Sequence, residues 1–188
     1  MYRNGNDYDS MAKLAIDMLC DYDIAEFPLN EKDVCKKIGV KLVPYSAYEN
    51  EEFELLSKKS PDAFYVPPIQ MKPPVIFYND TVKNEGRRKF SVFHEVKHYV
   101  NNDTEECDYN DDLANYFARY IMCPIPYLIA LGIDDVFTII SDFGLSDEAA
   151  ENALTNLRNR RRVYGNKIFE YEKPLLDLLL PSNIEDIF

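Results

Sequence analysis

The sequence HEVKH at residues 94–98 decides how the rest of the chain is interpreted. It contains the only two histidines among 188 residues, four positions apart, with a glutamate directly after the first. Chance would give this spacing in about one in a thousand chains of this histidine and glutamate content. We therefore interpret the pair as functional.

Apolar residues around the pair predict a helix over residues 87–100. They recur in steps of three and four, the spacing of one buried helix face: Phe90, Phe93, Val96 and Val100. On this helix, a four-residue step places His94 and His98 on one face, where two imidazoles can bind one Zn²⁺. Such an ion lowers the pKa of a water molecule bound to it toward about 7. Glu95 lies about 100° around the axis, where it could accept the proton as a general base.

A catalytic zinc usually has three protein ligands and one open position. Since the chain has no third histidine, we expect the third ligand to be an acid or a cysteine downstream. The candidates are Asp103, Glu105, Glu106, Cys107, Asp108, Asp111 and Asp112.

A carboxylate on the following helix, expected at residues 111–122, can be held more rigidly than one on a loop. Asp111 is slightly favoured because it shares a helix face with Asn115, whereas Asp112 lies about 100° away. Asp111 could instead only cap its helix, in which case Asp112 or Asp108 would bind the metal. Asn115 would either orient a ligand or cap locally.

The remaining pattern predicts an α+β domain, with helices packed on a small sheet. Strands are expected at residues 40–43, 63–66 and 75–78, and further helices at 8–20, 30–38, 126–131, 136–143 and 147–162. The acidic stretch 46–54 is expected to be solvated. We predict a metallopeptidase domain over residues 1–125, and a C-terminal helical region and tail over 126–188 that packs on it.

The net charge of the chain argues against nucleic acids and anionic membranes as partners. The chain carries 21 Lys and Arg against 33 Asp and Glu, a net charge of −12, which repels phosphate backbones and anionic lipid. The arginine-rich run at residues 158–162 therefore fits a helix C-terminus or an acidic partner better than DNA. No apolar run approaches the ~20 residues of a membrane span. Four widely spaced cysteines and no apolar signal segment predict reduced thiols in the cytoplasm.

Two blocks resemble the ImmA/IrrE family of metallopeptidases. RRKFSVFHEVKHY at residues 87–99 is similar to the family pattern R-x-x-F-x-x-x-H-E-x-G-H. DDLANYFARYIMCP at residues 111–124 is similar to E-x-x-A-N-x-F-A-x-x-L-L-M-P. The likeness covers most of residues 8–162 and implies a gluzincin-like fold, in which a zincin-like helix pair packed on a small sheet holds zinc.

The resemblance also implies a function and roles for residues. Family members act as cytoplasmic endopeptidases that cleave helix-turn-helix repressors of mobile elements or stress regulons. By position, His94 and His98 would be zinc ligands, Glu95 the base, and Asp111 would replace the third-ligand glutamate. Tyr99 and Tyr109 are candidates for a hydroxyl that stabilises the oxyanion. Mn²⁺ or Fe²⁺ could take the place of zinc.

Two departures from the family pattern keep other functions open. Asp111 is one methylene shorter than glutamate, and Lys97 stands where the family usually has glycine. The long lysine would either reach out to an acidic neighbour or change the cleft. The alternative is therefore a catalytically weak or inactive antirepressor, a binding module on the same scaffold. A DNA-binding regulator that uses residues 146–162 is the third possibility.

Overall fold

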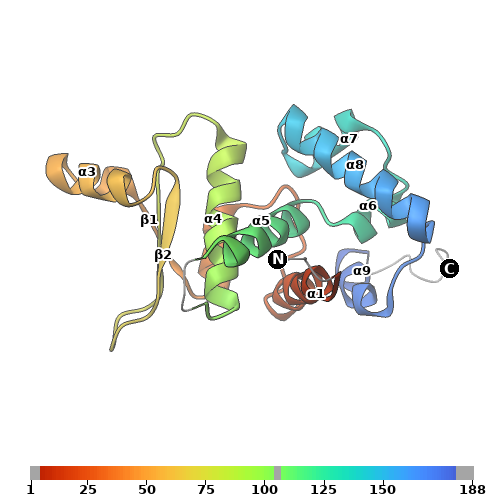
Figure 1. Ribbon diagram of the computed structural model, residues 1–188, viewed down its shortest axis with the longest axis horizontal. Helices are drawn as coiled ribbons and strands as arrows, with labels where there is room; N and C mark the ends of the chain where they lie inside the picture. The colour runs from red at the N-terminus through yellow and green to blue at the C-terminus, as the bar shows by residue number, and fades with distance from the viewer. Residues whose placement is uncertain (1–4, 104–106, 181–188) are drawn as a thin grey trace. The chain divides into compact units, whose positions relative to one another are not determined.

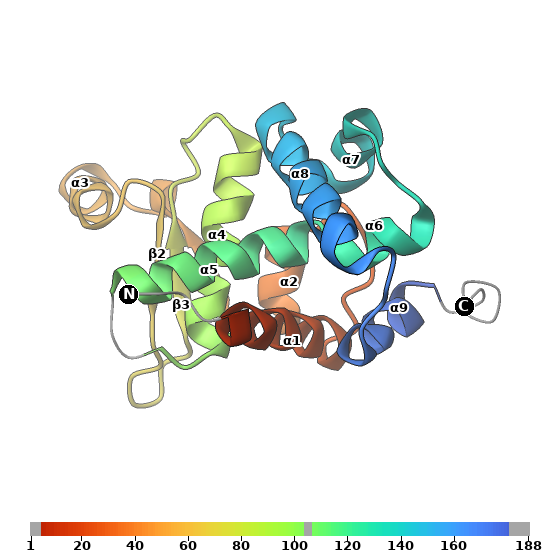
Figure 2. The ribbon, with the colours of Figure 1, turned by 45° about the vertical axis from the view of Figure 1, so that its right-hand side comes forward.

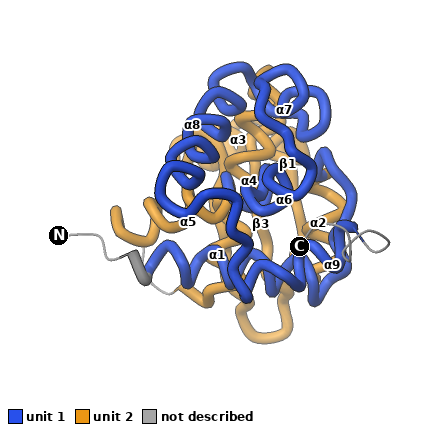
Figure 3. The backbone as a smooth tube through the Cα atoms, turned by 90° about the vertical axis from the view of Figure 1, so that its right-hand side faces the viewer, with its two compact units in different colours: residues 1–29, 119–188 blue, residues 30–118 orange. Residues whose placement is uncertain are grey.

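The computed structural model describes residues 5–103 and 107–180 and divides the chain into two compact units. Unit 1 combines residues 1–29 with 119–188, and unit 2 comprises residues 30–118 (Figure 3). The predicted ligand candidates Glu105 and Glu106 lie outside the described residues. The expected domain boundary after residue 125 stays a prediction.

Unit 2 contains a three-stranded mixed sheet in the order β1-β3-β2. The strands are β1 (Lys41–Pro44), β2 (Ala63–Val66) and β3 (Val75–Tyr78). β1 is parallel to β3 and β2 is antiparallel to it, with Ile76 opposite both Leu42 and Tyr65. Prolines at 67, 68, 73 and 74 bound the pairing of β2 with β3, because proline cannot donate a ladder hydrogen bond.

Among the described residues, five helical elements accompany this sheet. They are α2 (Glu31–Lys37), the 3₁₀ turn η1 (Tyr45–Ala47), α3 (Asn50–Lys59), α4 (Glu85–Val100) and α5 (Asp108–Met122), which continues into unit 1. α4 packs against β2 and β3 on one face of the sheet, and α3 lies on the other side (Figures 1 and 2). Phe93 and Val96 of the predicted stripe are fully buried, whereas Phe90 and Val100 are half-buried.

Unit 1 is built from helices within its described residues. They are α1 (Gly5–Asp21), α6 (Ile125–Leu131), α7 (Val136–Phe143), α8 (Asp147–Tyr164), η2 (Glu170–Glu172) and α9 (Lys173–Leu179). α8 packs on α6 and α7, and α9 packs on α1 and α6. Ser146 caps α8, as its sequence position predicts, by accepting a hydrogen bond from Ala149 N at 3.3 Å.

The predicted α+β class, with a small sheet and additional C-terminal helices, is confirmed. The acidic stretch 46–54 contains the start of α3, a helix that the sequence did not indicate. α3 has no buried residue, so it lacks the buried face on which a prediction from apolar periodicity depends. Among the described helices, none combines the length and apolar character needed to cross a bilayer.

Candidate metal centre

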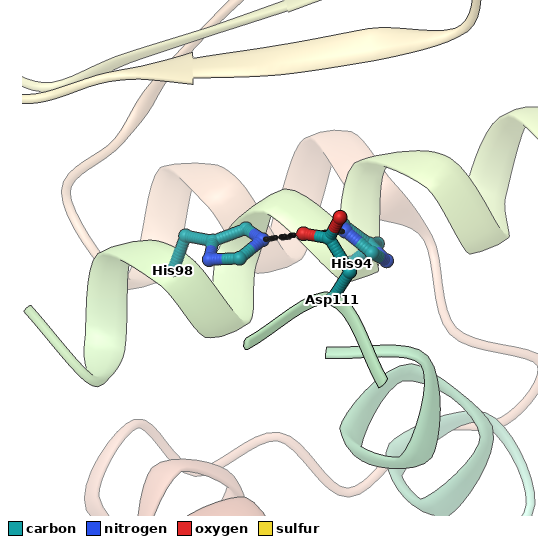
Figure 4. Close-up of side chains that lie close together, drawn as sticks. All are labelled: His94, His98 and Asp111. Carbon is teal, nitrogen blue, oxygen red and sulfur yellow. Dashed lines mark hydrogen bonds and ion pairs between the residues drawn. The ribbon is translucent and has the colours of Figure 1, made fainter. Parts of the chain in front are cut away.

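The two histidines predicted to bind metal lie on α4, and an N-cap residue stabilises the start of this helix. Asn84 is the N-cap, and its side chain accepts a hydrogen bond from Arg87 N at 2.9 Å. Ten residues further along, His94 and His98 project from the same face of the helix, and Asp111 reaches them from the first turn of α5 (Figure 4). Two consecutive helices of unit 2 therefore supply the three side chains.

The ligand atoms of these side chains are spaced as one ion requires. The Nε2 atoms of His94 and His98 are 3.2 Å apart, and Asp111 Oδ1 lies 3.8 Å and 3.7 Å from them. Ligands about 2.05 Å from a tetrahedral Zn²⁺ are about 3.3 Å from one another. The three residues therefore fit a divalent ion with only small adjustments, and they are the group of potential ligands that converges within 4.8 Å in the described chain.

The group is buried on the histidine side and open on the carboxylate side. The side chains of His94 and His98 are 18% and 11% exposed, whereas that of Asp111 is 52% exposed. A structural zinc site is closed by four protein ligands, but a catalytic one keeps a position that water and substrate can reach. Three ligands with an open side match the catalytic type.

Asn115 lies behind His94 as seen from the ligand atoms. Its Oδ1 is 3.0 Å from His94 Nδ1, so a proton on Nδ1 can be donated to it while Nε2 keeps its lone pair. Burial is the largest influence on the pKa of His94 and lowers it; His98 and Lys97 add to the lowering, and the Asn115 hydrogen bond and Asp111 oppose it. The lowered pKa favours the neutral imidazole, the form that binds metal.

Asp103 has the corresponding place behind His98. Its Oδ2 is 2.7 Å from His98 Nδ1 and 2.5 Å from Lys97 Nζ, and its Oδ1 accepts a hydrogen bond from Asn101 Nδ2 at 2.6 Å. Burial raises the pKa of Asp103, but the hydrogen bonds from Lys97, Asn101 and His98 outweigh burial, so the pKa is lowered. A carboxylate behind a histidine ligand fixes its tautomer and raises its basicity.

Glu95 faces the sheet. Its Oε2 accepts a hydrogen bond of 2.8 Å from the backbone N–H of Tyr65 in β2. This N–H belongs to a strand on which α4 packs, so the carboxylate is oriented by backbone and not by a mobile side chain. Glu95 directly follows His94 in the sequence and lies on the side of α4 that meets β2.

The remaining predicted residues have other surroundings. The converging group includes neither Asp108 nor Asp112 among the described residues, and the exposed Cys107 is also outside it. The Tyr99 hydroxyl donates to the carbonyl oxygen of Ile38 at 3.2 Å, and Tyr109 is 44% exposed. The oxyanion role of the two tyrosines stays a prediction.

The roles of Asp103 and Lys97 were missed from sequence. Asp103 was considered only as a direct ligand, and Lys97 was expected to reach an acidic neighbour or alter the cleft. It does meet an acid, but its side chain is fully buried. A signal was available: Lys97 stands four residues after Phe93 and hence on the buried face, where a cation requires an acidic partner close by.

Comparison with known proteins gives one match. The family model described as the IrrE N-terminal-like domain, Peptidase M78, matches residues 35–155, more than half of the chain. No curated protein and no solved structure matches at a significant level. The matched region contains α4, the described part of the α4–α5 connection and all of α5, and thus every residue of the converging group.

Proposed function

Because this chain belongs to the peptidase family of IrrE N-terminal-like domains, we propose that it is a zinc-dependent endopeptidase. The observation that carries the proposal is the convergence of His94, His98 and Asp111 at ligand spacing within the matched region. His94 and His98 each have an acceptor behind Nδ1, which is the arrangement typical of histidine ligands. The solvent-facing side of Asp111 leaves room for water and substrate.

In this proposal, His94, His98 and Asp111 hold the ion. When bound, a divalent ion supplies Lewis acidity, which polarises a peptide carbonyl and makes water more acidic. Glu95 then serves as the general base that takes a proton from the attacking water and later gives it to the leaving amine. Its hydrogen bond to Tyr65 N holds one carboxylate oxygen in place during both transfers.

The position of β2 supports a peptide as substrate. β2 is at one edge of the sheet order β1-β3-β2, and the backbone N–H of Tyr65 in this strand donates to Glu95. An extended peptide can add to a free strand edge through main-chain hydrogen bonds. A substrate bound along β2 would bring its main chain to the side of α4 that carries Glu95.

We further propose a helix-turn-helix repressor as the substrate, on the family resemblance of the two sequence blocks. The experiment mixes the purified chain with candidate helix-turn-helix repressors and follows new fragments by intact-mass spectrometry, with and without a chelator. Metal analysis of the same sample should find about one zinc per chain, and Mn²⁺ or Fe²⁺ in its place would revise the ion only.

Glu95→Gln should retain zinc and lose cleavage, because glutamine cannot take up the proton. Glu85→Gln is the matched control on the same helix, since the side chain of Glu85 is 65% exposed and pairs with Lys89, and it should cleave as the wild type does. Cleavage by the Glu95 variant would exclude Glu95 from the mechanism. A stable complex without fragments in any sample would support the antirepressor in place of the peptidase.

A further inference from the structure

The inference concerns Lys97, a lysine with no solvent exposure in the middle of the proposed metal centre. It rests on the proposed function, because it assigns a role toward the same three ligands. Burying an ammonium group is costly unless opposite charge and hydrogen bonds compensate it. The contacts of its Nζ therefore indicate what the residue does.

The first contact is with Asp103. Lys97 Nζ lies 2.5 Å from Asp103 Oδ2, the same oxygen that is 2.7 Å from His98 Nδ1. The side chain of Asp103 is only 7% exposed, and a buried carboxylate requires an opposite charge and hydrogen bonds close by. Lys97 supplies that charge and holds the oxygen on the line toward Nδ1.

The second contact joins the two helices that carry the ligands. Lys97 Nζ donates a hydrogen bond of 3.2 Å to the carbonyl oxygen of Asn110. Asn110 directly precedes Asp111 in the first turn of α5. One ammonium group therefore contacts both the acceptor behind His98 and the peptide group next to the third ligand.

We propose that Lys97 is a positioning residue of the metal centre, which holds Asp103 against His98 and the start of α5 against α4. Through Asp103 it fixes the tautomer of His98 with the proton on Nδ1, so that Nε2 faces the ion. Through Asn110 it sets how close Asp111 approaches the histidines. The lysine touches neither the ion nor the substrate and acts only through these two residues.

The first experiment uses the metal-free wild-type chain. The ¹⁵N spectrum of the two histidine side chains reports which ring nitrogen carries the proton, and two histidines give few signals to assign. His98 should be in the Nδ1–H tautomer. An Nε2–H tautomer for His98 would overturn the proposed positioning, and the measurement needs no variant that could fail to fold.

The second experiment measures zinc affinity by competition with a chromophoric chelator. Lys97→Met keeps an unbranched apolar side chain, one atom shorter, and loses the charge. It should weaken zinc binding 10- to 100-fold, the range for residues that orient metal ligands. The visible spectrum of bound Co²⁺ should also change, because it reports ligand geometry. Lys89→Met is the control on the same helix, since Lys89 pairs with the exposed Glu85, and its affinity should stay that of the wild type.

A double variant tests whether Lys97 acts through Asp103. Because one of its two contacts is with Asp103, Lys97→Met combined with Asp103→Asn should lose less affinity than the sum of the two single losses, whereas a role independent of Asp103 would make the losses fully additive. Additive losses, or a Lys97→Met chain with wild-type affinity and Co²⁺ spectrum, would overturn the inference. A wild-type chain that bound no zinc would instead refute the proposed function, so the two failures are distinguishable.

Discussion

Replacing Asn115 with leucine should weaken zinc binding about tenfold, because leucine has the same branching and number of side-chain heavy atoms but cannot accept the hydrogen bond from His94 Nδ1. Residues behind a metal ligand typically contribute 10- to 100-fold in affinity. Two features of the structure place the expected effect of Asn115 at the lower end of this range, near tenfold. Its amide oxygen is neutral, so the 3.0 Å hydrogen bond lacks charge assistance. The side chain of His94 is also 18% exposed, so water can replace part of the lost contact.

Comparison with Asp103 adds a prediction about the relative loss of zinc affinity. Asp103 is an ionised acceptor behind His98, is only 7% exposed and has no comparable access to water. Asp103→Asn should therefore cost more zinc affinity than Asn115→Leu, although the two residues occupy equivalent places. Tenfold corresponds to about 1.4 kcal/mol, and a hundredfold to about twice that.

The assay is competition for zinc against a chromophoric chelator, with circular dichroism to verify that each variant is folded. Asn115→Asp is the informative companion, because a carboxylate at this position raises the basicity of the ligand, and its affinity should equal or exceed that of the wild type. Wild-type affinity in Asn115→Leu would refute the view that Asn115 orients His94. Weaker binding by Asn115→Asp than by Asn115→Leu would refute it equally.

Two further predictions concern residues away from the proposed metal centre. Iodoacetamide at pH 8 should label the exposed Cys107 first and leave Cys35 and Cys123 unmodified. Burial raises the pKa of both buried thiols to about 12, and the reactive thiolate forms only near that pH. Peptide mass spectrometry checks this, and labelling of Cys35 or Cys123 in folded protein would contradict it. Glu172→Gln should destabilise the fold by about 3–5 kcal/mol in urea unfolding, because it leaves the guanidinium of Arg160 without the fully buried carboxylate that it now contacts at 2.5 Å and 2.6 Å. A loss below about 1 kcal/mol, the size expected for an exposed ion pair, would show that the pair is unimportant for stability.

The sequence predicted the parts of the fold that follow from periodicity and capping. The strands 63–66 and 75–78 and the helix 136–143 were predicted at the bounds the structure has, because proline, glycine and polar residues delimit them. α3 could not be predicted, since it buries no face. α9 could not be predicted because the tail is apolar without clean periodicity, although Leu175 and Leu176 are buried in it.

For the candidate site, helical spacing predicted the relations between residues on the same helix, but not between helices. A four-residue step fixed the relation of His94 to His98, and the same step related Asp111 to Asn115. The distance between the two helices was not available from spacing, so the sequence favoured Asp111 only slightly and left Asp108 and Asp112 as alternatives. The contact of Glu95 with β2 was also hidden, because it joins residues 30 positions apart.

Two arginines of the run at residues 158–162 make contacts within unit 1. Arg160 has a side chain that is only 12% exposed; besides Glu172, it contacts the carbonyl oxygen of Lys167 and stacks on the ring of Phe169. Arg161 donates to the side chain of Asn166. Two of the four arginines thus connect α8 to the segment that follows it, which leaves less of the run available for DNA.

The two departures from the family pattern have one physical explanation. An aspartate at position 111 reaches less far than a glutamate, so its carboxylate can lie 3.7–3.8 Å from the histidine nitrogens only if α5 starts close to α4. Lys97, which replaces a glycine of that pattern, bonds to the carbonyl oxygen immediately before Asp111 and fills the space between the helices with its buried stem. If the lysine compensates for the shorter acid, Lys97→Gly should lose zinc affinity, and Asp111→Glu in the same chain should restore part of it.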